Sequence, residues 1–136
     1  MELHVIKNDD TTMTMAYRVA RIVYAETLAK SLRVVEAMTS MIANATVNNK
    51  ISIDDFISNT NIFESLNHES TRHVYLSVDA KTPAFQMCVR VAQRMLRGNL
   101  ADSCNHATIF HREDIMPQWA MSRGYVADID GILFYK

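Results

Sequence analysis

The hydrophobic residues of this chain follow a helical period over most of its first hundred positions. The first run predicts a helix that starts after Thr11 or Thr12, either of which can cap it, and that ends near Ala29. A second predicted helix begins near Ser31 and fades into the polar run 44–50. Its apolar face is formed by Leu32, Val35, Met38, Met41, Ile42 and Ala45.

Two further helices are predicted beyond this pair. Ser52 and Asp55 form a Ser-x-x-Asp opening, close to a capping box, at the start of a short helix. Thr82-Pro83 is a cap and first-turn pair that opens a longer helix, which runs to about Arg97 and stops at Gly98. The apolar face of this longer helix is formed by Phe85, Cys88, Val89, Ala92, Met95 and Leu96.

Between these helices, residues 59–73 show no clear period and predict a surface loop that carries a few apolar side chains. After Gly98 the pattern changes to strands. Residues 107–111 predict a short strand, and two further β-type runs flank Asp130-Gly131, a good hairpin turn signal. The segment between them predicts a loop with one helical turn. We therefore expect a single α+β domain over residues 1–136, with helices first and a small antiparallel sheet last.

Composition narrows the class of protein. The 136 residues are 49% hydrophobic, which is typical of a globular protein with a real core. Fourteen basic residues against fifteen acidic ones leave a net charge of −1, which argues against a nucleic-acid binder. No apolar run approaches the roughly 20 residues that span a bilayer. We expect Cys88 and Cys104 to be buried free thiols, because their spacing specifies no pairing.

One residue conflicts with its surroundings. In the first predicted helix, Glu26 falls on the apolar face with Val19, Ile22, Val23 and Ala29. Burial of an ionised carboxylate is costly unless it is paired or gives up its charge. The sequence therefore poses the question of why a carboxyl group stands in this stripe.

Two interpretations of Glu26 follow from the residues alone. In the first, Glu26 forms an i,i+4 pair with Lys30 at the edge of the helix, worth ~0.3 kcal/mol. In the second, it is a catalytic acid. Cleavage of a glycosidic bond needs an acid that is still protonated near neutral pH, and poor solvation favours the protonated form of a carboxyl group.

Four blocks of the chain, in order and at matching spacing, resemble the SleB-type (spore-cortex-lytic) cell wall hydrolases from about Tyr17 onward. "VARIVYAET", followed by a helix that ends "MIANA", resembles that family's "ARVIYAEARGE…VLNR" opening. "FQMCVRVAQRMLRG" and "NHATIFH" are similar to its third helix and its "ATHYH" strand, and "PQWAMSRGYVADIDGILFYK" is similar to its closing block.

The resemblance implies a lysozyme- or lytic-transglycosylase-like domain that acts on peptidoglycan. It implies cleavage between N-acetylmuramic acid and N-acetylglucosamine by a single catalytic glutamate, which aligns with Glu26, and no cofactor. It also suggests substrate contacts for Glu64, as a possible second acid, and for Phe63, Phe110 and His111. Trp119 and Tyr125 offer flat surfaces on which sugar rings can rest, with core packing as the alternative for Trp119 and a purely structural role as the alternative for His111. A zinc site at Cys104, His106 and His111 is rejected, because the spacing matches no standard site.

The chain departs from the family pattern where that pattern has a second acid. Where the family has Glu-Ala-Arg-Gly-Glu, residues 26–30 of this chain read Glu-Thr-Leu-Ala-Lys, so Lys30 stands in place of the second acid. The first histidine of the family's strand is replaced by Ile109. With one carboxylate left, the resemblance favours a lytic transglycosylase, in which the sugar's own C6 hydroxyl attacks. The alternative is an inactive glycan-binding or assembly protein that keeps the fold.

The N-terminus carries no export signal in this sequence, with no basic start followed by an apolar segment. A protein of this kind acts at the bacterial cell wall, in the periplasm or outside the cell. We therefore expect a bare catalytic domain of the type used in phage lysis or carried on a virion. The sequence indicates peptidoglycan glycan strands as the partner, with no nucleic acid and no membrane span.

Overall fold

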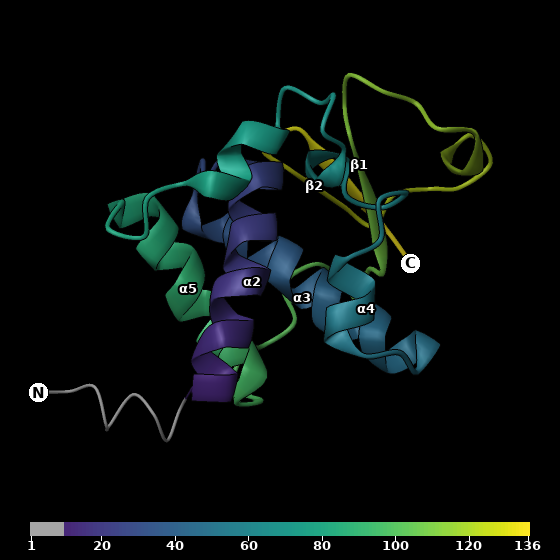
Figure 1. Ribbon diagram of the computed structural model, residues 1–136. Coiled ribbons are helices and arrows are strands. Elements are labelled where there is room, and N and C mark those ends of the chain that lie inside the picture. Colours follow the sequence, from purple (N-terminus) through teal and green to yellow (C-terminus); the bar gives the residue numbers. More distant parts are fainter. Residues whose placement is uncertain (1–9) are drawn as a thin grey trace, which may run out of the picture.

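The computed structural model describes residues 10–136 and has the predicted order of helices first and a small sheet last (Figure 1). The first helix begins at Asp10, ahead of Thr11 and Thr12, and its capping residue lies outside the described residues. The described elements are α2 (Asp10–Thr27), α3 (Leu32–Asn49), α4 (Ile53–Ile57), the 3-10 helices η1 (Glu64–Leu66) and η2 (His73–Ser77), α5 (Pro83–Leu96), β1 (Ile109–Arg112), the 3-10 helix η3 (Gln118–Ala120), β2 (Ala127–Ile129) and β3 (Ile132–Tyr135).

Helix α2 ends at Thr27, two residues earlier than the hydrophobic pattern predicts. Leu28 and Ala29 both have left-handed backbone conformations, with φ of 56° and 52°. The Thr27 hydroxyl donates to the carbonyl of Val23 (2.7 Å) and accepts from the amide of Ala29 (3.1 Å). These two bonds satisfy polar groups at the helix end and turn the chain sharply toward α3.

Helix α3 begins where predicted but extends further. The Ser31 hydroxyl accepts from the amide of Val34 (3.1 Å), which is an N-cap. The helix continues through most of the polar run 44–50 and ends at Asn49, and the C-cap residue Lys50 has a left-handed φ of 55°. Leu32 is 48% exposed, so its predicted place on the apolar face is wrong, although the other predicted members of that face are buried.

The two remaining helices agree with their sequence signals. Ser52 caps α4 by accepting from the amide of Asp55 (3.0 Å). Helix α5 opens at Thr82-Pro83, where the threonine side chain makes no capping hydrogen bond, and Gly98 follows its end with a φ of 75°. The buried face of α5 also includes Val91, which the predicted face did not.

The C-terminal strands form one antiparallel sheet in the order β1–β3–β2. The predicted hairpin turn at Asp130-Gly131 is confirmed, with φ values of 52° and 82° that suit a type I′ turn. In the first pair of strands, Phe110 lies opposite Phe134 and Arg112 lies opposite Ile132. Because side chains alternate along a strand, Arg112 shares the core-facing side with Phe110.

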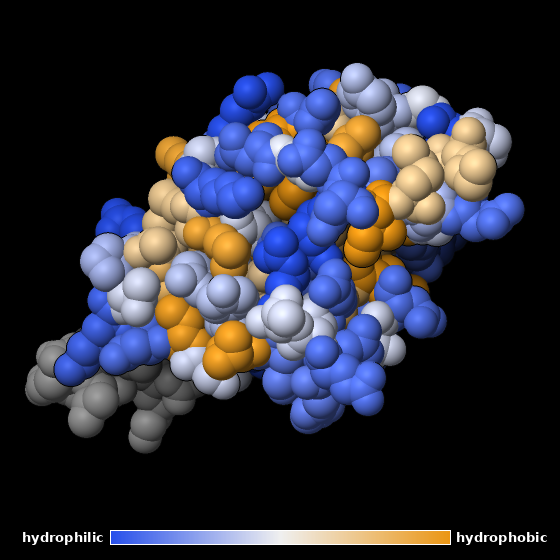
Figure 2. Space-filling model, turned by 90° about the horizontal axis from the view of Figure 1, so that it is seen from above, coloured by the Kyte–Doolittle hydropathy of each residue, from blue (hydrophilic) through white to orange (hydrophobic). Residues whose placement is uncertain are grey.

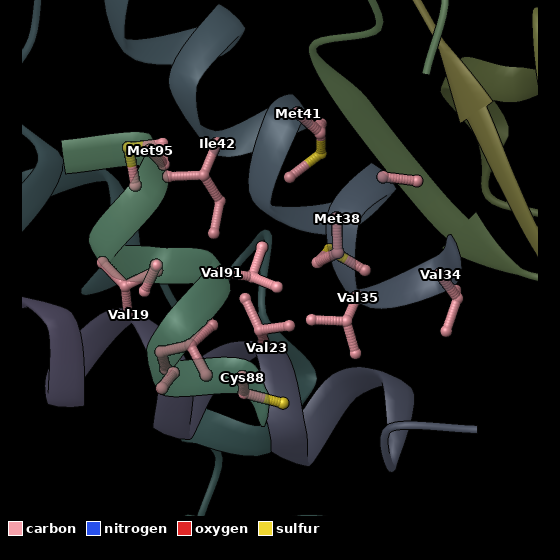
Figure 3. Packing of buried hydrophobic residues seen from close by; sticks show 14 of the residues in the cluster. Val19, Val23, Val34, Val35, Met38, Met41, Ile42, Cys88, Val91 and Met95 are labelled. Atoms are coloured by element: carbon pink, nitrogen blue, oxygen red, sulfur yellow. The ribbon is translucent and has the colours of Figure 1, made fainter. Parts of the chain in front are cut away.

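The hydrophobic core lies between α2, α3 and α5 and continues onto the sheet. Figure 3 shows valine and methionine side chains of the three helices, among them Val23, Val35 and Val91, converging on one another. Cys88 and Cys104 are buried free thiols, as predicted. Burial raises the pKa of each thiol to about 12, so neither is a reactive thiolate near neutral pH.

The segment between α4 and α5 has little regular structure, and side-chain hydrogen bonds fasten it to α2. The Arg21 guanidinium donates to the carbonyls of Leu76 (3.0 Å) and Val78 (2.8 Å) and lies over the ring of Phe85, 4.8 Å from its centroid. This arrangement holds η2 against α2. In the described part of the chain, no helix is both long and apolar enough to cross a membrane.

The Ser31 cap also provides a tertiary contact, and this gives a first prediction. Its hydroxyl donates to Asp130 Oδ2 at 2.5 Å, which ties the start of α3 to the hairpin turn. Ser31→Ala therefore loses both a cap and a hydrogen bond to a carboxylate, and we expect it to lower the free energy of unfolding by about 1–2 kcal/mol.

The matched control is Ser52→Ala, which removes a cap from α4 at an exposed position. We expect this change to cost less, about 0.5–1 kcal/mol. Urea unfolding followed by circular dichroism measures both values. Equal losses for the two variants would show that the Ser31–Asp130 contact adds no stability.

Candidate active site

Glu26 lies in the last turn of α2, one residue before the helix ends. Its side chain is 0% exposed, which confirms that it shares the buried face of the helix. The sharp turn at Leu28 and Ala29 ends the helix immediately afterwards. The carboxyl group is therefore withheld from bulk water at the end of a rigid element.

Both oxygens of Glu26 accept hydrogen bonds from nitrogen donors. The backbone amide of Ser65, in η1, donates to Oε2 at 2.8 Å, and Arg112 Nη1, at the end of β1, donates to Oε1 at 2.5 Å. The arginine side chain is 11% exposed, so this ion pair is largely shielded from solvent. A buried charge needs such partners, and the partner here is Arg112 and not the predicted Lys30.

Arg112 also binds a second carboxylate. Its Nη2 donates to Glu64 Oε1, and the hydroxyl of Ser70 donates to the other oxygen of Glu64 at 2.7 Å. The hydrogen bond from Ser70, followed by the charge and the hydrogen bond of Arg112, holds the pKa of Glu64 below its ordinary value, although burial opposes this shift. One guanidinium thus bridges Glu26 of α2 and Glu64 of η1.

The segment around η1 is held in place by side chains that bind backbone carbonyls. Arg72 Nη1 donates to the carbonyls of Ala25 (3.1 Å) and Glu26 (3.4 Å). These carbonyls lie in the last turn of α2, where a helix no longer supplies backbone donors. The Nδ1 atom of His73 is 2.9 Å from the carbonyl of Ser65. These bonds fix the amide that Ser65 directs at Glu26.

Two hollows open on the surface on either side of Arg112. We call them the first and the second hollow, and Arg112 borders both. Figure 2 looks down on this end of the molecule and shows hydrophilic side chains running across its middle between apolar ones. The first hollow is lined by Glu26, Thr27, Lys30, Arg72, Arg112, Glu113, Asp114, Asp130, Gly131 and Ile132, and the second by Thr60, Asn61, Ile62, Glu64, Asn67, Phe110, His111, Arg112, Ile115, Pro117 and Trp119.

An aromatic cluster supports the second hollow. His111 Nε2 is 2.8 Å from the hydroxyl of Tyr135, and its Nδ1 is 2.9 Å from the carbonyl of Arg112, so both ring nitrogens have partners within the protein. Trp119 packs its edge against both rings, with centroids 5.7 Å from His111 and 5.1 Å from Tyr135. His111 is therefore buried and fixed, whereas Trp119 stays half-exposed beside the hollow.

Comparison with protein-family models gives one match, to the family described as Cell Wall Hydrolase, over residues 35–135 of the 136-residue chain. The chain belongs to the cell wall hydrolase family. No curated protein and no solved structure matches it. Membership makes the protein an enzyme of a family that acts on peptidoglycan at the cell wall.

The matched span of the cell wall hydrolase includes Glu64, Arg112 and most of both hollows, but it begins after Glu26. The match therefore supports the substrate class without identifying the catalytic residue. The case for Glu26 rests on its position in the structure and on the "YAE" block of the sequence.

Several predicted site residues of the hydrolase lie elsewhere. Phe63 is 0% exposed and packs on Phe56 and Phe110 in the core, so it has no surface left for a sugar, which corrects that expectation. Phe110 is 6% exposed and only borders the second hollow. Tyr125 is 55% exposed and does not line either hollow.

The interpretation of Glu26 as a partner of Lys30 is also corrected. Because α2 ends at Thr27, the two residues are not one turn apart on a helix, and Lys30 is exposed at the rim of the first hollow. Among the described residues, no three metal-binding side chains come together. The Asp130-Gly131 turn borders the same hollow, so it lies near the C-terminal end of α2.

Sequence reasoning missed Arg112 because the predicted strand 107–111 ends one residue before it, and the structure is needed to show its orientation. A basic residue stands on the core-facing side of a strand, just as Glu26 stands on the apolar face of a helix. Two opposite charges, each in an apolar stripe, are best explained by a buried pair. Ser65 binds Glu26 through its backbone amide, and a contact of this kind cannot be predicted from the pattern of side chains.

The lowered pKa of the Glu64 carboxyl group gives a second prediction. Its folded-state pKa lies below the ordinary value of 4.5, so its ionisation adds stability above that pH, and the contribution is lost as the pH falls through the folded-state pKa. We expect Glu64→Gln to be less stable than the wild type at neutral pH, and the difference to shrink below about pH 4.5.

Denaturant unfolding at a series of pH values measures this difference. Glu69→Gln, which removes an exposed carboxylate from the same segment, is the matched control. A Glu64→Gln deficit that is the same at neutral pH and at about pH 3 would contradict the predicted role of Glu64 ionisation.

Proposed function

We propose that this cell wall hydrolase cleaves the glycan strand of peptidoglycan between N-acetylmuramic acid and N-acetylglucosamine, with Glu26 as the acid and base. The observation that carries the proposal is the position of Glu26. Its carboxyl group is fully buried yet borders a surface hollow, at the end of a rigid helix. A proton donor to a glycosidic oxygen needs this combination of poor solvation and access to substrate.

The proposed reaction runs in two proton transfers. Glu26, in its protonated form, gives its proton to the oxygen that links the two sugars, and the bond between that oxygen and C1 of the muramic acid breaks. The C6 hydroxyl of the same sugar then bonds to C1 as Glu26, now a carboxylate, takes the hydroxyl proton. The products are a free 4-hydroxyl on one sugar and a 1,6-anhydro end on the other, and no water is consumed.

The surroundings of Glu64 support this intramolecular route over hydrolysis. A hydrolase of either stereochemistry uses two carboxylates around the scissile bond. Glu64 borders the second hollow whereas Glu26 borders the first, and the Arg112 guanidinium lies between them, so Glu64 is poorly placed to activate water beside Glu26. The C6 hydroxyl, by contrast, is held beside C1 by the sugar itself, at a high effective concentration.

The first hollow contains other carboxylates that sequence reasoning did not consider. Asp130 is bound by Ser31, but Glu113 and Asp114 follow β1 directly and are exposed. Hydrolysis in place of transglycosylation would use one of these two side chains as the base for water. The product end distinguishes the two routes.

The second candidate function is a glycan-binding or assembly protein without catalysis. The observation in its favour is that the resting Glu26 carboxylate is fully occupied by Arg112 and Ser65. Release of soluble muropeptides from purified sacculi decides between the two. Binding to sacculi without release would favour the second candidate.

Glu26→Gln gives a third prediction. The amide side chain is nearly isosteric, and its oxygen can still accept from Ser65 or Arg112, so we expect the fold to survive. It cannot donate and recover a proton as the acid does, so we expect sacculus clearing to fall at least about 100-fold.

Circular dichroism and thermal unfolding check that the Glu26→Gln variant is folded, and turbidity of a sacculus suspension measures its activity. Clearing at the wild-type rate by this folded variant would remove Glu26 from the mechanism. Glu36→Gln is the matched control, because Glu36 pairs with Arg94 on the surface, away from both hollows.

The fourth prediction concerns the product. We expect mass spectrometry of the released muropeptides to find 1,6-anhydro ends in the wild type and also in Glu113→Gln and Asp114→Asn. Predominantly reducing ends would mean that water is the nucleophile, and loss of activity in one of these two variants would then identify the second carboxylate.

A further inference from the structure

Arg112 occupies a position that no other described residue shares. It alone borders both hollows, and its guanidinium spans from Glu26, on the first hollow, to Glu64, on the second. The side chain is 11% exposed. It therefore forms a partition between two spaces that would otherwise adjoin.

A polymeric glycan needs a continuous path on both sides of the bond that is cut. As the structure stands, the guanidinium interrupts that path beside Glu26, and it also occupies the Oε1 atom from which a proton would be given. The partition is a long side chain at the end of a strand and not a backbone segment. Rotation about its side-chain bonds clears the path without rearranging the core.

The two ends of the bridge differ in exposure, and this favours one direction of movement. The side chain of Glu26 is 0% exposed and that of Glu64 is 37% exposed. Glu64 remains within reach of the guanidinium on the solvent side, so Arg112 can leave Glu26 while it keeps a carboxylate partner. The positive charge of Arg112 then keeps a carboxylate partner throughout, and Glu26 keeps the hydrogen bond from the amide of Ser65.

We propose that Arg112 is a gate residue, whose guanidinium divides the glycan groove and occupies Glu26 until an entering glycan strand displaces it toward Glu64. This inference rests on the proposed function, because it takes the two hollows as halves of one glycan site.

The other cations at the site do not fit this role. Arg72 also borders the first hollow, but it donates to backbone carbonyls of α2 and holds the η1 segment in place. Lys30 is exposed at the rim and forms no hydrogen bond or ion pair with Glu26 in the part of the chain that the structure describes. The remaining charged groups around the first hollow are Glu113, Asp114 and Asp130, which are acidic.

A closed gate weakens substrate binding by the fraction of molecules that are open. If the open form makes up about 10% of the population or less, removing the gate lowers the apparent KM about tenfold or more. In the proposed reaction Arg112 itself gives and takes no proton, since both proton transfers are made by Glu26. The gate proposal therefore expects kcat to be maintained.

The test is steady-state cleavage of soluble, peptide-free glycan strands by the full chain. We expect Arg112→Met to lower KM about tenfold with kcat undiminished. Glu64→Gln is the second variant. It keeps the buried pair of Arg112 with Glu26 but removes the negative charge of the more exposed carboxylate toward which Arg112 would move. If Arg112 is displaced toward Glu64, this variant raises KM. The matched control is Arg90→Met, at an exposed site on α5, which leaves both constants unchanged.

Each outcome decides something. If Arg112→Met is folded and lowers kcat with KM unchanged or raised, Arg112 positions Glu26 and the gate is refuted while the proposed function stands. If Arg112→Met does not fold, an unchanged or lowered KM in Glu64→Gln refutes the gate. If the wild type and Arg90→Met both fail to cleave the strands, the proposed function fails, and the gate that rests on it fails too.

Discussion

The charge of Glu26 is the constraint on which the arrangement of the site depends. A carboxylate at the buried end of a helix is tolerated only with partners of opposite charge or with hydrogen-bond donors. The chain supplies both from distant segments, the amide of Ser65 from η1 and the guanidinium of Arg112 from β1. Helix, loop and sheet are thereby brought to one point, and the two hollows form around it.

Much of the fold was predictable because it depends on local signals. The caps at Ser31 and Ser52, the stop at Gly98 and the hairpin turn at Asp130-Gly131 each reflect the chemistry of a few adjacent residues. The early end of α2 was not predictable from the apolar pattern. It depends on a threonine hydroxyl that bonds both Val23 and Ala29, and such a bond leaves no trace in hydrophobic spacing.

The site was harder to predict than the fold, because its partners are remote in sequence. Glu26 was found from its misplaced charge, and its burial agrees with that. Its bridge to Glu64 runs through Arg112, 86 residues away along the chain, and only the pairing of β1 with β3 shows which way that arginine faces. Phe63 was assigned to the substrate from the family resemblance, which carries no information on burial, and it lies in the core.

The wall of the site formed by the segment between α4 and α5 is held by arginine side chains and not by a ladder of backbone bonds. Arg21 reaches outward from α2 to the carbonyls of Leu76 and Val78, and Arg72 reaches back from the segment to those of Ala25 and Glu26. A guanidinium can bind two carbonyls at once, which the compact ammonium of lysine does less well. The shape of the site therefore depends on two arginine side chains that bind backbone carbonyls, so a change at either of them would move this wall without altering Glu26 or Glu64.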